Sequence, residues 1–110
     1  MATNYYGRFR DLSHQYGLLF SNEPYWGPFD NMQVGETADL VMCEFWSGDL
    51  AFFDSPKFVA SIAKLNGNPI AEAEAFTDMG GWHQHPAKLK PIGDLAWTQG
   101  INRFVFHSYV

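Results

Sequence analysis

The chain has very few cysteines, few basic residues and no long apolar run. Cys43 is its one cysteine, so no internal disulfide can form. This cysteine stands in an apolar stretch, which predicts a small buried hydrophobe rather than a nucleophile. Seven Lys and Arg are outnumbered by twelve Asp and Glu, for a net charge of -5. Because nucleic acid requires a basic surface, we expect no nucleic-acid partner.

Membrane and export signals are also missing from the sequence. No apolar run is long enough to cross a bilayer, so we expect no membrane partner. The first residues lack the basic and then apolar pattern of a signal peptide. In contrast, 46% of the residues are hydrophobic and only 17% are charged, which is enough apolar material for a core and argues against disorder.

Strand-like and helix-like segments alternate along the chain. The predicted strands cover residues 18–22, 39–46, 68–77 and 101–109, and the predicted helices cover 5–16, 56–66 and 86–99, with one short turn within 29–37. Ser55 is expected to cap the second helix, which begins at Pro56. The expected buried stripes are Phe9, Leu12 and Tyr16; Phe58, Ile62 and Leu65; and Leu89, Ile92, Leu95 and Ala96.

Strands separated by helices predict a parallel sheet with crossover connections. Two architectures fit this order, an open doubly wound sheet and part of a (β/α)8 TIM barrel. The open dinucleotide-binding sheet needs a Gly-rich phosphate turn, which Gly80-Gly81 does not supply. We therefore predict an α/β fold of about four parallel strands that form part of a barrel. Because a whole barrel needs about 250 residues and both ends fall inside predicted elements, residues 1–110 are expected to be a fragment of a catalytic domain.

Glutamates stand at or near the ends of three predicted strands. These are Glu23, Glu44 and Glu74, and His107 holds the corresponding place on the fourth strand. Functional groups of parallel α/β folds gather at the carboxyl ends of the strands. One such glutamate is as often a salt-bridge partner as a reacting group, but three at equivalent positions favour a shared site. Paired carboxylates serve general acid and base chemistry, and carboxylates also bind calcium.

Further residues are expected around these glutamates. Glu72 shares the face of Glu74 one layer deeper, where Arg103 is a candidate ion-pair partner. The rings of Trp26, Trp46 and Trp82 follow predicted strands and are suited to stacking on a sugar, although capping the core is an equally good explanation.

A pair of histidines precedes the last predicted helix. His83 and His85 are two residues apart, but no third ligand stands near them, so a loop or capping role is favoured over a metal pair. The sequence assigns no metal ligand.

Several short segments, taken together and in order, resemble glycoside hydrolase family 106, the α-L-rhamnosidases. The segments are 6–12 (YGRFRDL), 21–28 (SNEPYWGP), 44–46 (EFW), 74–77 (EAFT) and 100–107 (GINRFVFH). The resemblance covers nearly the whole chain. It implies the central part of a (β/α)8 catalytic barrel belonging to a longer protein with accessory β domains.

The resemblance also implies an activity and its setting. It implies hydrolysis of terminal α-L-rhamnosyl groups from plant glycans by an inverting mechanism, with calcium at the site. It further implies a bacterial protein that is secreted or periplasmic in its full-length form. The catalytic candidates are Glu23, Glu44 and Glu74, and the candidates for binding the carbohydrate substrate are Trp26, Trp46, Trp82, His107 and Arg103.

Two other readings remain open at this point. One is a non-catalytic carbohydrate-binding module that uses the tryptophans as a platform. The other is a half-barrel without activity that self-associates through its open sheet edges, because unpaired edges and apolar faces favour association.

Overall fold

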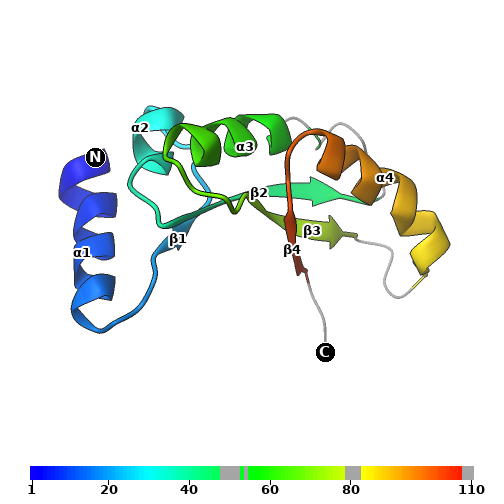
Figure 1. Cartoon of the computed structure of the whole chain (residues 1–110), viewed down its shortest axis with the longest axis horizontal. Helices are drawn as coiled ribbons and strands as arrows, with labels where there is room; N and C mark the ends of the chain where they lie inside the picture. The colour runs from blue at the N-terminus through cyan, green and yellow to red at the C-terminus, as the bar shows by residue number, and fades with distance from the viewer. Residues whose placement is uncertain (48–52, 54, 79–82, 108–110) are drawn as a thin grey trace.

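The computed structural model describes residues 1–47, 53, 55–78 and 83–107. Its elements in chain order are η1 (Ala2–Gly7), α1 (Arg8–Gln15), β1 (Ser21–Asn22), α2 (Asn31–Gly35), β2 (Leu40–Trp46), α3 (Pro56–Leu65), β3 (Glu72–Thr77), α4 (Pro86–Thr98) and β4 (Arg103–Phe106). The helices α2, α3 and α4 lie along one face of the sheet, and α1 lies at one end of the molecule (Figure 1).

The four strands form one parallel sheet. Their order in the sheet is β1-β2-β3-β4, so each strand pairs with its neighbour in the sequence. In a doubly wound sheet the order of the strands reverses at a switch point, whereas in a barrel each strand is added beside the one that precedes it in the sequence. The predicted α/β fold with four parallel strands is therefore confirmed, and the sequential order is consistent with part of a barrel.

The core lies between the sheet and the helices. Val41, Cys43 and Phe45 alternate along β2 and are buried on the helix side, where Val59 and Ile62 of α3 join them. Burial raises the pKa of the Cys43 thiol to about 12, so the thiolate that a nucleophile needs is not formed at neutral pH. The prediction that Cys43 is a buried hydrophobe is confirmed.

The start of α3 differs from the prediction. Pro56 occupies the first turn as expected, but the Ser55 side chain makes no capping hydrogen bond. Its hydroxyl instead donates to the backbone oxygen of Glu44 at 3.2 Å. Ser55 thus ties the start of α3 to the end of β2, and the capping prediction was wrong.

The predicted buried stripes were partly wrong. Phe9, Leu12 and Tyr16 are all exposed, because α1 lies at the end of the sheet and not against its face (Figure 1). In α3, Ile62 is buried as predicted, but Leu65 is 70% exposed. The face turned to the sheet carries Val59, Ile62 and Ala63, and in α4 it carries Ile92, Gly93 and Ala96, while Leu95 is exposed and Leu89 half-buried.

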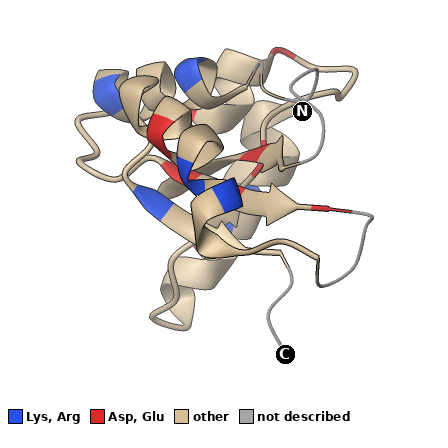
Figure 2. Cartoon of the chain, turned by 90° about the vertical axis from the view of Figure 1, so that its right-hand side faces the viewer, with Lys and Arg blue, Asp and Glu red and all other residues tan. Residues whose placement is uncertain are grey.

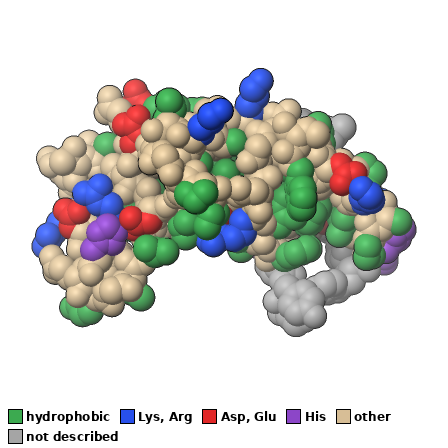
Figure 3. Space-filling model, in the orientation of Figure 1, with side chains coloured by type: hydrophobic (Ala, Val, Ile, Leu, Met, Phe, Trp, Pro, Cys, Tyr) green, Lys and Arg blue, Asp and Glu red, His purple; other side chains and the backbone are tan. Residues whose placement is uncertain are grey.

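A polar contact joins α1 to the start of β2. His14 Nε2 and the Phe20 backbone N–H each lie 2.8 Å from Asp39 Oδ2. Burial alone would raise the pKa of Asp39, but the Phe20 N–H and His14 outweigh it and hold this pKa below its ordinary value. An imidazole beside acidic and basic side chains is visible at the α1 end of the surface (Figure 3).

The two edge strands are shorter than predicted. Strand β1 has only two residues, and β4 ends at Phe106, followed by a turn at His107. Residues 108–109 of the predicted fourth strand lie outside the described residues. Within the described part of the chain, no helix has the length and apolar character needed to cross a membrane.

Candidate active site

The sheet face opposite the helices carries the candidate glutamates. Because side chains alternate along a strand, Glu44 of β2 points away from its buried neighbours Cys43 and Phe45. Glu44 is the register partner of Glu74 on β3, so both side chains project from the same face of adjacent strands. Acidic positions on the strands and near a strand end are visible in the rotated view (Figure 2).

The loop after β1 brings a third carboxylate to this group. Glu23 directly follows β1, and the buried Pro24 fixes the start of the loop. The backbone N–H of Tyr25 donates to the Glu23 carbonyl at 3.0 Å, which folds the loop back on itself. The Tyr25 hydroxyl then donates to Glu44 Oε2 at 3.1 Å. A tyrosine from the β1 loop thereby joins the ends of β1 and β2.

The environment of Glu23 favours its protonated form. Partial removal of the carboxyl from water raises the pKa of Glu23 above its ordinary value. The negative charges of Glu74 and Glu44 raise it further, while the Tyr25 hydroxyl and His107 act in the opposite direction. The charges of Glu44, Glu74 and His107 thus all act on Glu23, so these strand ends belong to one electrostatic cluster. A raised pKa makes a carboxyl better suited to act as a proton donor.

Glu44 and Glu74 are each held by further donors. The indole N–H of Trp46 donates to Glu44 Oε1, while Tyr25 occupies the other oxygen. The Thr77 hydroxyl donates to Glu74 Oε1 at 3.3 Å, and His107 Nδ1 lies 3.8 Å from the same oxygen. Each of these two carboxylates therefore has an orienting partner on its own strand.

A bulge in β3 places Thr77 on the glutamate face. Trp46 pairs with Thr77, and Phe45 pairs with Ala75, so Phe76 is the extra residue. Phe76 has a φ of 64°, a left-handed conformation that costs a non-glycine residue about 1 kcal/mol or more. Its ring turns towards the helices, packing against Phe45 and Phe104. The left-handed conformation of Phe76 thus directs the Phe76 ring into the core and places the Thr77 hydroxyl beside Glu74.

The deeper layer of this face holds an ion pair. Glu72 of β3 pairs with Arg103, its register partner on β4, as the sequence predicted. The Glu72 side chain is 3% exposed and the Arg103 side chain 45% exposed. Arg103 therefore binds Glu72 as a structural partner, while part of the Arg103 side chain remains accessible to solvent.

The predicted aromatic platform is only partly described. Trp26 is 70% exposed and lies in the β1 loop with a φ of 55°. Trp46 is half-buried and is the last residue of β2, not a loop residue as expected. Trp82 lies outside the described residues. His83 is exposed, and His85 precedes α4 without a side-chain cap, so neither contributes to the glutamate cluster by a recorded contact.

Sequence reasoning missed two polar members of the cluster, Tyr25 and Thr77. Tyr25 stands in the segment 21–28 that carried the family resemblance, two residues after Glu23, and that position was its signal. Thr77 could not be found from strand alternation, because the bulge at Phe76 changes the face on which it lies.

Calcium is the metal ion that the family resemblance implies for this site. Calcium takes six to eight oxygen ligands. Among the residues that the structure describes, no group of three or more His, Cys, Asp or Glu side chains could hold a metal ion. The described residues thus do not fit a calcium site.

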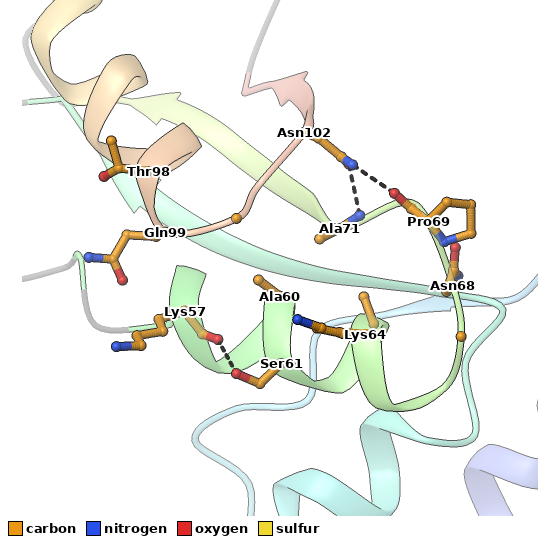
Figure 4. Close-up of a pocket in the computed structure, with 13 residues that line it drawn as sticks. Lys57, Ala60, Ser61, Lys64, Asn68, Pro69, Ala71, Thr98, Gln99 and Asn102 are labelled. Carbon is orange, nitrogen blue, oxygen red and sulfur yellow. Dashed lines mark hydrogen bonds between the residues drawn. The ribbon is translucent and has the colours of Figure 1, made fainter.

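A hollow elsewhere on the surface is lined by groups with a structural role. It opens beside α3 and the end of α4 and has a volume of about 570 Å³ (Figure 4). Asn102 there accepts from the Ala71 N–H at 2.9 Å and donates to the Pro69 carbonyl at 2.7 Å, and Ser61 donates to the Lys57 carbonyl at 2.8 Å. These polar groups stabilise the backbone, and the hollow does not contain the glutamates.

Glycoside hydrolases use carboxylates placed in this way, on one face at the ends of successive parallel strands, as their catalytic groups. The model of glycoside hydrolase family 106, described as alpha-L-rhamnosidase, matches residues 1–110. The chain belongs to this family.

One relative differs from the family description in its name. A protein of Formosa agariphila named "Putative beta-glucuronidase" is 70% identical over 110 residues. The match covers 100% of this chain and 10% of that protein, so the chain spans about a tenth of its relative's length. No solved structure matches the chain significantly.

Proposed function

We propose that the chain supplies part of the active site of an enzyme that cleaves terminal α-L-rhamnosyl groups from plant glycans. One observation carries the proposal: Glu23, Glu44 and Glu74 stand at or near three successive strand ends, and the charges of Glu44 and Glu74 act on Glu23. Family membership supports glycoside hydrolysis in general, and the description of the family supports rhamnose.

The chemistry requires two carboxyl groups in different protonation states. The protonated carboxyl donates its proton to the glycosidic oxygen as the bond from the anomeric carbon to that oxygen breaks. The ionised carboxylate accepts a proton from the water that attacks the anomeric carbon, so the products are rhamnose and the free alcohol. Inversion by this route is what the family resemblance implies. Within the cluster, burial and neighbouring charge suit Glu23 to the protonated role.

The charge of the site supports a neutral sugar over a uronic acid. Rhamnose carries no charge, whereas a glucuronide brings a carboxylate close to Glu23, Glu44 and Glu74. Like charges in a partly desolvated site repel each other. Arg103 is already paired with Glu72 and cannot fully offset this repulsion. A glucuronide is the second candidate, because the Formosa relative carries a glucuronidase name.

Further residues are proposed to bind the sugar. Trp26 has an exposed ring and directly follows Tyr25 in the sequence. Trp46 has a half-buried ring and donates a hydrogen bond to Glu44. His107 and the accessible part of Arg103 lie beyond Glu74 on the β4 side. Trp82 stays a candidate from the sequence. We infer that the tryptophans stack on the apolar face of the sugar while the polar groups bind its hydroxyls.

The remaining expectations concern the whole protein. We propose a secreted or periplasmic location, as the family resemblance implies. Calcium is also implied by the family, but the described residues do not fit it, so no step here depends on calcium.

Self-association is proposed for any form in which the sheet edges stay open. Leu18 and Leu19 next to β1, and Val105 and Phe106 in β4, are exposed, and hydrophobic side chains reach the surface of the face that carries β4 and α4 (Figure 3). Unpaired strand edges with apolar side chains favour pairing with further strands. Sedimentation of the 110-residue chain should therefore show dimers or larger species, and a strictly monomeric chain would contradict this proposal.

A non-catalytic carbohydrate-binding module is the weaker alternative. Such a module would need the aromatic rings and not the carboxylates. The parallel α/β sheet and the coupled glutamates favour an enzyme.

A substrate comparison tests the proposed function. The full-length protein that contains this chain is given 4-nitrophenyl α-L-rhamnoside and 4-nitrophenyl β-D-glucuronide, and nitrophenol release is measured. We expect turnover of the rhamnoside and little or none of the glucuronide. Turnover of the glucuronide alone would establish the second candidate. Sugar binding without any turnover would establish the binding module.

A further inference from the structure

The ends of β2 and β3 carry two pairs of register partners on the glutamate face. Glu44 pairs with Glu74, and Trp46 pairs with Thr77. On each strand the outer residue donates a hydrogen bond to the glutamate: the Trp46 indole to Glu44 Oε1, and the Thr77 hydroxyl to Glu74 Oε1 at 3.3 Å. Thr77 is the third residue after Glu74, whereas Trp46 is the second after Glu44. Strand β3 therefore uses one more residue than β2 to make the corresponding contact.

The extra residue of β3 is Phe76, and its backbone is strained. In a regular strand a residue and the third residue after it point to opposite faces, so Thr77 could not reach Glu74. The bulge brings Thr77 to the glutamate face and requires a φ of 64° at Phe76. Strain of this kind concentrates at functional sites, where surrounding contacts hold it in place. The contact between Thr77 and Glu74 is what the strain achieves on this face.

The neighbouring strand holds the backbone of Thr77 in place. The Thr77 carbonyl accepts the Ser47 N–H at 2.9 Å and the Ser47 hydroxyl at 3.4 Å. Thr77 is 4% exposed, so its side chain has little freedom to turn towards solvent. The Thr77 hydroxyl is therefore a donor with a fixed position relative to Glu74.

The two oxygens of Glu74 have different surroundings. Oε1 accepts the Thr77 hydroxyl and lies 3.8 Å from His107 Nδ1. No hydrogen bond to Oε2 is recorded among the residues that the structure describes, and the Glu74 side chain is 27% exposed. In Glu44, by contrast, both oxygens accept hydrogen bonds. Within the described part of the chain, Glu74 thus has one anchored oxygen and one oxygen left for a bound substrate.

We propose that Thr77 is a positioning residue that anchors Oε1 of Glu74 and so presents Oε2 to the bound sugar. The inference rests on the proposed glycoside hydrolysis and deepens it, because it names a residue that the reaction needs although this residue does not touch the reacting bond. A carboxylate held at one oxygen by a rigid strand end keeps a fixed direction at its other oxygen. This orientation matters for the rate, because misplacing a reacting group by about 1 Å can cost about 100-fold.

Substitutions that separate the Thr77 hydroxyl from the Thr77 methyl test the proposal. In the full-length protein, Thr77→Val keeps the shape of the side chain without the hydroxyl, whereas Thr77→Ser keeps the hydroxyl and loses a buried methyl. With 4-nitrophenyl α-L-rhamnoside, we expect Thr77→Val to lower kcat by about 10- to 100-fold and to keep KM within about threefold of the wild type. Thr77→Ser should keep kcat within about threefold, although the lost methyl lowers its thermal midpoint. Thr77→Ala is a second variant without the hydroxyl and should match Thr77→Val in kcat.

Thr37→Val is the matched control for the loss of a partly buried hydroxyl. Thr37 donates to the Val34 carbonyl at 2.7 Å and precedes β2, at the opposite end of that strand from Glu44. This variant should turn over substrate at the wild-type rate. Thermal midpoints show which variants are folded at the assay temperature. A normal kcat in the variants without the Thr77 hydroxyl overturns the proposal, and so does a kcat that follows the thermal midpoint through all the Thr77 variants.

A double-variant cycle shows whether Thr77 acts through Glu74. Glu74→Ala removes the carboxylate that Thr77 positions, so adding Thr77→Val to it should change kcat by less than about twofold. The same loss in both backgrounds would show that Thr77 acts elsewhere and would overturn the proposal.

Failure of the proposed function is a separate outcome. If the wild type hydrolyses 4-nitrophenyl β-D-glucuronide and no rhamnoside, the proposed substrate is wrong, and the same order of variants is expected on the glucuronide. A wild type that hydrolyses neither glycoside contradicts the proposed function itself. An active wild type with an unaffected Thr77→Val contradicts only the role of Thr77.

Discussion

Glu44 and Glu74 are register partners on the adjacent parallel strands β2 and β3. Their backbones are therefore about one strand spacing apart, roughly 4.8 Å, and their side chains leave the same face of the sheet. Two carboxylates this close are costly unless donors or a shared proton compensate. Trp46 and Tyr25 supply donors to Glu44, and Thr77 supplies one to Glu74.

The raised pKa of Glu23 predicts a stability effect with a definite sign. A carboxyl whose pKa is higher in the folded state stabilises the fold below its unfolded value near 4.5, and this contribution is lost as pH rises through the folded value. Glu23→Gln should therefore unfold at a higher temperature than the wild type at pH 7, and the difference should shrink towards pH 4.

Thermal unfolding midpoints between pH 4 and pH 7 check this prediction. Glu36→Gln is the control, because Glu36 is an exposed residue at the end of α2 and reports the general effect of removing one negative charge. If the gain in Glu23→Gln did not grow with pH, or matched that of the control, the electrostatic description of Glu23 would be wrong.

The Glu72–Arg103 pair predicts an asymmetric response to mutation. Arg103→Met leaves a buried carboxylate without its partner and should destabilise the protein by about 3 kcal/mol, near the low end for buried pairs because Arg103 is half-exposed. Combining it with Glu72→Leu removes the unpaired charge and should recover most of the loss. Unfolding measurements on the single and double variants test this, and a double variant no more stable than Arg103→Met would contradict it.

The bulge at Phe76 predicts that alanine is worse than glycine at this position. Both substitutions remove the ring from the contacts with Phe45 and Phe104, which should cost about 2–4 kcal/mol. Alanine keeps the cost of a φ of 64°, whereas glycine adopts it freely. Phe76→Gly should therefore be the more stable of the two by about 1 kcal/mol in thermal unfolding. The opposite order would show that the bulge relaxes when the ring is absent.

The parallel sheet was predictable because its signals are local. The apolar strand segments and the predicted helices at 56–66 and 86–99 matched β2, α3, β3 and α4 to within a few residues. The glutamates could be placed at strand ends for the same reason. The short β1 and the exposed face of α1 could not, since they depend on how the ends of the sheet are covered.

The details of the site depended on contacts that no local pattern encodes. Tyr25 reaches Glu44 only because the loop after β1 folds back across the neighbouring strand. Thr77 reaches Glu74 only because Phe76 takes a left-handed conformation. Strand alternation alone would have put Phe76 on the glutamate face and Thr77 in the core.

Rhamnose release by glutamate variants of the full-length protein tests the central claim most directly. Glu23→Gln, Glu44→Gln and Glu74→Gln are each compared with the wild type and with Glu36→Gln, using a rhamnose-terminated plant glycan. If these side chains form the active site, each of the three should lower the rate by about 100-fold or more, while Glu36→Gln retains it. Near-normal release by all three variants would contradict the account.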